Sequence, residues 1–222
     1  MANTTFQGTV RAESGLKVST KTAATGAYTD YFTVSSAGAV TASSTLSVTG
    51  RSTLTGNTIA TTAGTGITSG SGTIYASSAI KSGGMYHTKI LMDLTGLASS
   101  GSADIIGKDS TANCHIGQIT AAVSGTLLGG QITCLEVPAG GDPDIDLWYA
   151  DEATGTEDAA ISGLTNQVQV TNGGDHTLGG VDAFLAGVVP AANKYLYLGS
   201  GAATNADYTA GRLLIEMWGY SA

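Results

Sequence analysis

The chain has 222 residues, of which 12% are charged and 32 are glycine. The charged share is about half of the ~25% found in ordinary soluble domains. Too few Lys, Glu, Arg and Gln are present to cover long exposed helices, which disfavours an all-helical fold. The net charge is −8, and the nine Lys and Arg are scattered along the chain. This distribution excludes the clustered basic surface by which proteins bind nucleic acid.

The N-terminal sequence shows no basic segment followed by an apolar run, so we expect no signal peptide and synthesis in a cytoplasm. No apolar run reaches the roughly 18 residues of a membrane span, so we expect no membrane partner. In a cytoplasm Cys114 and Cys134 are expected to be reduced and buried, and a single disulfide between them is the alternative.

The composition changes near Gly84. Residues 1–84 carry a net charge of +3 and isolated apolar residues, whereas residues 85–222 carry −11 and contain dense apolar clusters. The Gly83-Gly84 pair at the change is typical of a hinge or linker. We therefore predict three parts: an N-terminal anchoring arm over residues 1–27, a repeat shaft over residues 28–84, and a head domain over residues 85–222.

The arm has a net charge of +2, which suits an acidic partner surface. It has only a few sizeable apolar groups, and burying each fully would contribute about 1.5–3 kcal/mol. We expect the anchoring contacts to come from these groups and two neighbouring cations: Phe6, Val10, Arg11, Leu16, Lys17 and Val18.

The shaft contains a weak repeat of short alternating segments closed by glycine turns, as in residues 45–50 and 53–56. Each segment offers two or three apolar side chains, too few to offset about 1–2 kcal/mol of backbone entropy per residue. We therefore predict a homotrimer whose shaft strands face a common axis. The alternatives are a strap that adds strands to another protein and a disordered tail. The predicted trimer contacts are Val34, Val40, Leu46, Val48, Leu54 and Ile59.

The head reads as many short strands separated by turns, which indicates an all-β sandwich of two sheets. Its most apolar strands stand at the two ends, as in a jelly roll whose first and last strands pair. The second and third predicted strands look like a hairpin or meander, and residues 182–189 form a short helix or a buried loop before Pro190. The predicted strands cover residues 86–95, 114–123, 131–137, 145–150, 194–198 and 212–220.

The last predicted strand is apolar on both of its alternating faces. A strand of this kind is buried on both sides. We therefore expect the head's core on one side of it, and a subunit interface or a covering loop on the other.

No catalytic or cofactor-binding motif is present, and the three histidines, His87, His115 and His176, are far apart in the sequence. A metal site needs at least three converging ligands. We therefore predict a protein that is not an enzyme and uses no cofactor.

Asp142, Asp144 and Asp146 alternate as in the opening of a calcium loop. Leu147 and Ala153 stand where an EF-hand needs glycine and an acid, so an EF-hand is excluded. We expect a solvated turn that holds no tightly bound ion, with Asp144 and Asp146 on its exposed face. A structural Ca²⁺ site of another kind is the alternative.

Four aromatic residues lie in two of the predicted strands, residues 145–150 and residues 194–198. Aromatic rings in a sandwich more often belong to the core and to interfaces, and the alternative is a sugar-stacking surface. The residues are Trp148, Tyr149, Tyr195 and Tyr197.

The opening segment, residues 4–17, reads T-T-F-Q-G-T-V-R-A-E-S-G-L-K. It resembles the N-termini of virion structural proteins of marine tailed phages, cyanophages especially, which read T-T-F-x-G-P-V-R-S-x-x-G-F/L. The chain departs from that pattern at Thr9 and Ala12. Residues 133–142 and 206–216 resemble the C-terminal domain of the same proteins. The resemblance implies a virion protein exposed on the particle, on the capsid, neck or tail.

The function we expect is a non-enzymatic capsid decoration or cement protein, or a short head fibre, attached to other virion proteins through its arm. The alternative is a tail-fibre or adhesin subunit whose head binds a host cell-surface glycan. A virion-borne glycan hydrolase is a third possibility, and it would need two carboxylates about 5–10 Å apart in a cleft. Only residues 28–84 are available for a shaft, which is short for a receptor-binding fibre.

Overall fold

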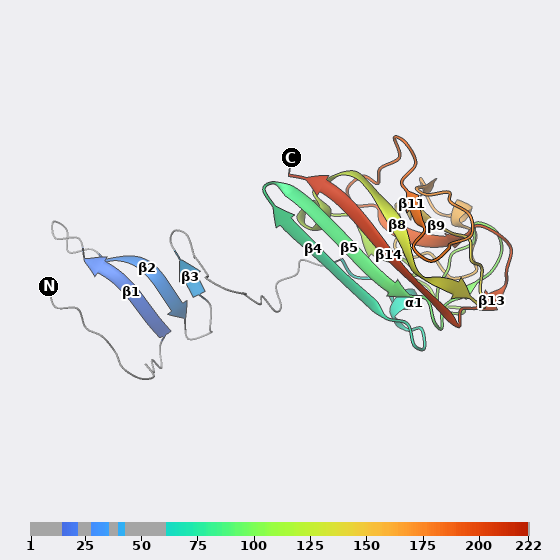
Figure 1. The fold of residues 1–222 in the computed structure, drawn as a ribbon, viewed down its shortest axis with the longest axis horizontal. Helices are drawn as coiled ribbons and strands as arrows, with labels where there is room; N and C mark the ends of the chain where they lie inside the picture. Colours follow the sequence, from blue (N-terminus) through green and yellow to red (C-terminus); the bar gives the residue numbers. More distant parts are fainter. Residues whose placement is uncertain (1–14, 22–27, 36–39, 43–60, 222) are drawn as a thin grey trace. The chain divides into compact units, whose positions relative to one another are not determined.

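The structure is a computed structural model that describes residues 15–21, 28–35, 40–42 and 61–221. The chain divides into two compact units, residues 1–55 and 56–222. Strands dominate both (Figure 1). The helices are single turns: α1 (Thr65–Thr68), α2 (Ala121–Ser124) and η1 (Ile161–Gly163). Among the described residues, no helix is long and apolar enough to cross a membrane.

The N-terminal unit contains an antiparallel sheet with the order β1-β2-β3. The register places Leu16 opposite Val34, and Val34 opposite Val40, so part of the predicted arm pairs with the start of the predicted shaft. Lys17 and Val18 lie in the same first strand. The strands are β1 (Gly15–Lys21), β2 (Tyr28–Ser35) and β3 (Val40–Ala42). The other predicted arm and shaft contacts lie outside the described residues: Phe6, Val10, Arg11, Leu46, Val48, Leu54 and Ile59.

The head begins earlier in the chain than Gly84. β4 (Tyr75–Ser82) pairs along its whole length with β5 (Met85–Asp93). Gly83 and Gly84, with φ of 56° and 82°, form the two-residue turn between these strands. Positive φ at both turn positions is the type I′ geometry that suits the twist of a hairpin. The glycine pair predicted to be a linker is therefore a hairpin turn, and β4 belongs to the head's sheet.

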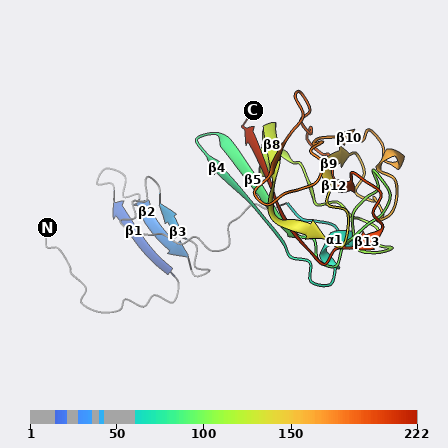
Figure 2. The same cartoon turned by 45° about the vertical axis from the view of Figure 1, so that its right-hand side comes forward.

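Two antiparallel sheets pack together in the head, which confirms the predicted sandwich-like arrangement. Figure 2 shows them as separate layers, with β4, β5 and β8 in one and β9, β10 and β12 in the other. The five-stranded sheet has the order β11-β8-β14-β5-β4, and its further strands are β8 (Thr126–Ala139), β11 (Val181–Ala183) and β14 (Ala210–Tyr220). The four-stranded sheet has the order β10-β9-β12-β7, with β7 (Gly117–Gln118), β9 (Ile145–Ala150), β10 (Val168–Gln169) and β12 (Tyr195–Ser200). A separate pair joins β6 (Ala98–Ser99) and β13 (Ala206–Asp207).

The core lies between the two sheets. Ile90 on β5 stands opposite Ile215 on β14, and both are fully buried. This pairing confirms that the first and last predicted head strands are neighbours. The four-stranded sheet contributes Leu147, Leu196 and Leu198, which are fully buried in the same cluster. Because these aliphatic side chains alternate with outward-facing residues, each sheet has one face in the core and one face away from it.

Two predicted head elements are wrong. Residues 114–123 do not form one strand: only β7 is extended, and α2 follows it, with the Thr120 side chain accepting a hydrogen bond from the Val123 amide (3.2 Å). β7 pairs with β12, so the predicted hairpin between the second and third strands is absent from the head. The start of the 182–189 segment belongs to strand β11, because residues 181–183 pair with β8. The residues that follow form no helix.

Candidate functional site

The outward face of the five-stranded sheet, which we call the outer face, is apolar. Along β14, Leu213 and Ile215 are fully buried, whereas Leu214 between them lies on the outer face, opposite Leu91 on β5. Large side chains exposed on the outer face include Ile80 (59%) and Leu135 (42%). These exposed fractions refer to the described residues alone. The predicted apolar second face of the last strand is therefore present, and within the described part of the chain it is open.

A shallow depression of about 370 Å³ crosses the outer face. It runs over four neighbouring strands, β4, β5, β14 and β8, and is lined mostly by small and aliphatic side chains, among them Ala76, Ser78, Lys89, Leu91, Leu135 and Leu214. Contiguous apolar surface of this kind is characteristic of interaction sites on proteins.

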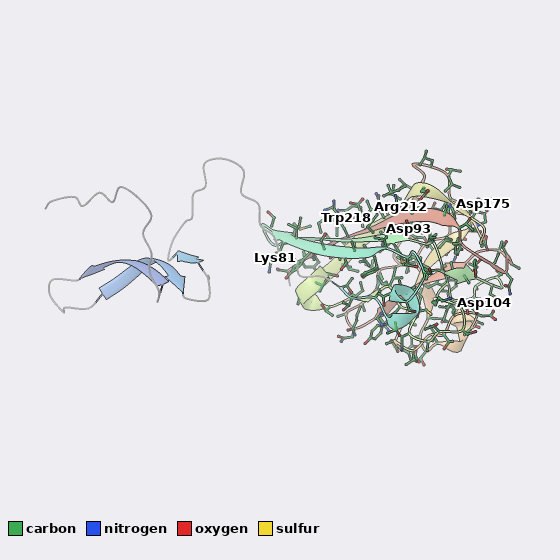
Figure 3. The ribbon with its side chains drawn as sticks, turned by 90° about the horizontal axis from the view of Figure 1, so that it is seen from below. Lys81, Asp93, Asp104, Asp175, Arg212 and Trp218 are labelled. Atoms are coloured by element: carbon green, nitrogen blue, oxygen red, sulfur yellow. The ribbon has the colours of Figure 1, made fainter. Side chains whose placement is uncertain are left out.

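Charged side chains border the depression on both sides. The Arg212 guanidinium lies 2.7 Å from Asp93 at one end. Glu216 lies 3.6 Å from Lys89 and 3.1 Å from His87 at the other end. Figure 3 views the sheet along its edge and shows Trp218, Arg212 and Asp93 on the side away from the rest of the head. This arrangement of an apolar centre and a charged border matches the anatomy of protein interfaces.

The ionisation of Asp93 follows from these contacts. Burial alone would raise the pKa of Asp93, but hydrogen bonds from Thr95 and Arg212 outweigh it and lower the pKa below its ordinary value. The carboxylate is therefore ionised at neutral pH, and the pair with Arg212 orients both side chains.

The Asp142 side chain is an internal anchor of its turn. It is fully buried, and its two oxygens accept hydrogen bonds from the backbone amides of Asp144 (3.0 Å) and Ala202 (2.7 Å). The backbone carbonyl of Asp142 accepts a hydrogen bond from the Tyr208 hydroxyl (2.8 Å). These hydrogen bonds fix the Asp142 carboxylate within its turn.

The prediction that Asp144 and Asp146 lie on an exposed face is wrong. Asp146 is only 4% exposed, because β10 and the segment after it cover this end of β9, and its carboxylate accepts a hydrogen bond from Gln169 (2.7 Å). Burial, and then the charge of Asp144, raise the pKa of Asp146 to about 6. Burial also raises the pKa of Asp144, followed by the charges of Asp142 and Asp175.

Within residues 15–21, 28–35, 40–42 and 61–221, no group of three or more His, Cys, Asp and Glu side chains is arranged to hold a metal ion. The candidate Ca²⁺ site at Asp142, Asp144 and Asp146 is not such a group.

The four aromatic residues do not form one exposed surface. Tyr197 is fully buried, and its hydroxyl donates to the Glu152 carbonyl (2.6 Å). Trp148, Tyr149 and Tyr195 are partly buried against the core, as the more common interpretation of such residues predicts. Trp148 also borders a polar pocket. The sugar-stacking alternative therefore remains open for this one ring.

The thiols and histidines behave as structural groups. Cys114 and Cys134 are both buried and are not joined, which confirms reduced, buried cysteines. Burial raises the pKa of Cys114 to about 12, so its thiol is protonated at neutral pH. His176 is buried, with Nε2 2.9 Å from the Ile145 carbonyl and Nδ1 3.1 Å from Asp182.

Sequence reasoning did not identify Gln169 and Ser200 as site residues. Both border the same polar pocket as Trp148, although they come from strands β10 and β12, far apart in the chain. Their types carry no motif, so only the strand pairing brings them together. No protein-family model, no curated protein and no solved structure matches this chain.

Proposed function

We propose that the chain is a non-enzymatic structural component of a phage particle, a capsid decoration or cement protein or a short head fibre, attached through its N-terminal arm. The observation that carries this proposal is the outer face, an open aliphatic surface with a charged border. A protein that assembles into a larger body buries such a face against a neighbour. The resemblance of residues 4–17 to virion proteins supports the same role.

The proposal assigns different tasks to the two units. The arm holds the chain to an acidic surface of the particle, and the shaft contacts join three copies of the chain. The outer face of the head then packs against a neighbouring subunit. The protein is made in the host cytoplasm and becomes exposed on the assembled particle, and the jelly-roll connectivity of the head belongs to this proposal as well.

Attachment is tested by mixing purified protein with particles that lack it. A chain without residues 1–27 is expected to lose most of its occupancy, measured by electron microscopy and by protein quantification of washed particles. Because β1 pairs with β2, this truncation also removes one strand of the N-terminal sheet. A chain without residues 1–14 keeps all three strands, and it is expected to lose occupancy too. Full occupancy by both truncated chains would show that the head makes the attachment.

Trimer formation has its own test. The full chain is expected to have the mass of three copies in solution at micromolar concentration, measured by native mass spectrometry. A clean monomer whose N-terminal unit resists protease would contradict the shaft contacts, since the unit would then be stable without partners.

A further inference from the structure

In the four-stranded sheet, β9 lies between β10 and β12 (Figure 2). A polar pocket lies where β9 begins and β12 ends. Its volume is about 260 Å³. The polar side chains around it are two acids, two amides, two hydroxyls and one indole: Ser102, Asp144, Asp146, Trp148, Gln169, Asn172 and Ser200. The pocket shares no residue with the outer face of the other sheet.

Three polar atoms in this pocket are buried and have no hydrogen-bond partner among the described residues. They are Asp144 Oδ1, Trp148 Nε1 and Ser200 Oγ, and Ser200 is only 2% exposed. Only one other side-chain atom in the described residues has this property, His115 Nδ1, and it lies elsewhere. Buried polar atoms are nearly always paired, with protein, water or ligand. Their concentration in one pocket indicates that a molecule from solution completes their hydrogen bonds.

Two glycines allow the indole and the Asp144 carboxylate to pack closely against the end of β12. A Cβ on Gly199 would come 3.0 Å from Trp148 Nε1, and a Cβ on Gly201 would come 2.1 Å from Asp144 Cγ. The Gly199-Ser200-Gly201 segment therefore leaves the space that the indole and the carboxylate occupy. Asp146 is held from the other side by Gln169 (2.7 Å), so the second carboxylate has a defined orientation.

The unpaired atoms define the chemistry of the ligand. The indole N–H can only donate, the Asp144 oxygen accepts when ionised, and the Ser200 hydroxyl does both. Two carboxylates repel an anion, and an indole N–H directed at the same space disfavours a metal ion. A neutral hydroxyl group, which donates and accepts at once, satisfies all three atoms, and the indole ring adds an apolar surface for C–H groups.

We propose that this pocket binds a neutral saccharide, with its hydroxyl groups bonded to Asp144, Trp148 and Ser200. The volume lies just below the roughly 300–1,000 Å³ of pockets for drug-sized ligands, so the pocket holds one sugar ring. This activity goes beyond the structural role, because a decoration protein and a tail fibre can each carry such a pocket.

The chain contains two tryptophans, which provides a site-specific probe. In the variant Trp218→Phe, Trp148 is the sole tryptophan, and its fluorescence is titrated with glucose, galactose, mannose and N-acetylglucosamine. At least one of them is expected to give a saturable change. Glucuronate is expected to bind at least about tenfold more weakly than glucose, because it adds a negative charge beside two carboxylates.

The matched controls use conservative substitutions. Trp148→Phe removes the indole N–H donor and part of the ring surface and leaves Trp218 as the reporter, and Trp218 emission is expected to be unchanged by the sugar. Ser200→Ala in the Trp218→Phe background is expected to weaken binding about tenfold, the effect of one lost hydrogen bond. Saturation-transfer NMR with the same sugars on the unmodified chain keeps the test valid if a variant fails to fold.

The proposal is overturned if no neutral sugar gives a saturable fluorescence change or a saturation-transfer signal. It is also overturned if Ca²⁺ alone changes Trp148 emission, which would make the pocket a cation site, or if Ser200→Ala binds sugar as tightly as the parent. Each of these results leaves attachment to the particle untouched, since that role depends on other residues.

Discussion

The two sheets of the head share one core and present different faces away from it. The five-stranded sheet exposes aliphatic side chains such as Ile80 and Leu135 over a broad shallow surface. The four-stranded sheet is covered by connecting segments, which bury Tyr197 and Asp146 on its outward side and leave a small polar pocket. An open apolar face suits a broad protein partner, and a narrow polar pocket suits a small ligand.

The difference arises in the connections rather than in the strands. β14 and β5 are neighbours in the sheet, and among the described residues of the head no segment crosses their outward face, so Leu214 and Leu91 line an open depression. Next to β9, the chain from residue 151 to residue 173 folds back over the sheet, and Gln169 and Thr171 bond to Asp146. One antiparallel scaffold therefore provides two kinds of surface according to which sheet its loops cover.

The strongest test of this comparison uses neighbouring leucines on β14. Leu213→Asp would bury an unpaired charge in the core and is expected to lower the free energy of unfolding by more than about 4 kcal/mol. Leu214→Asp changes only the outer face and is expected to lower it by less than about 1 kcal/mol while reducing occupancy on particles. Urea unfolding measures both variants. Equal losses would mean that the two faces are buried alike.

A smaller effect tests the covered sheet through pH. The folded-state pKa of Asp146, about 6, is above the ordinary 3.8, so folding favours the protonated acid. The stability from this group is complete below about pH 4 and is lost as the pH rises through 6. Asp146→Asn abolishes this dependence. The free energy of unfolding of the variant, relative to that of the parent, should therefore rise by about 2–3 kcal/mol from pH 4 to pH 7. A pH-independent difference between the two proteins would contradict the burial of this carboxylate.

The charged border of the outer face is expected to contribute less to the free energy of unfolding. Arg212→Gln leaves Asp93 without its cation and is expected to lower the free energy of unfolding only slightly, since the arginine is partly exposed. The pKa of Asp93 is lowered in the folded state, so the benefit is present near neutral pH and is lost as the pH falls below about 4. The loss should shrink in high salt, which thermal unfolding at two ionic strengths would show.

The smallest expected effect concerns metal ions. Because no three His, Cys, Asp or Glu side chains of the described residues are grouped to hold a metal ion, EDTA is expected to leave the melting temperature unchanged within a few degrees. Calcium added afterwards should not raise it, because an ion that binds only the folded state must raise stability by mass action. A fall of more than a few degrees that calcium reverses would mean that the turn is a metal site.

The strong apolar runs predicted most of the head. The clusters around Ile90, Leu147 and Ile215 form β5, β9 and β14, because alternating or continuous apolar runs bounded by turn residues favour buried strands. Residues 114–123 were harder to interpret: Ile116 and Ile119 are fully buried, yet most of this segment is irregular. Burial of a residue does not require it to be in a strand, so its apolar character alone does not fix the local conformation.

The details of the site depended on contacts that a linear sequence does not display. A Gly-Gly pair occurs in both linkers and type I′ turns, and only the pairing of Tyr75–Ser82 with β5 distinguishes the two. Asp144 and Asp146 looked exposed because they alternate with apolar residues, but the segment that covers them comes some twenty residues later. The pocket combines β9, β10 and β12, so no local motif marks it.

The position of β14 has a consequence for how the head is made. β14 is the central strand of the five-stranded sheet, pairing with both β8 and β5, and it is the last strand in the chain, ending at Tyr220. More than a hundred residues must be translated after β5 before its partner β14 is made, and contacts so distant in sequence form slowly. β14 must leave the ribosome before the core can close, so the apolar strands of the head need protection until then.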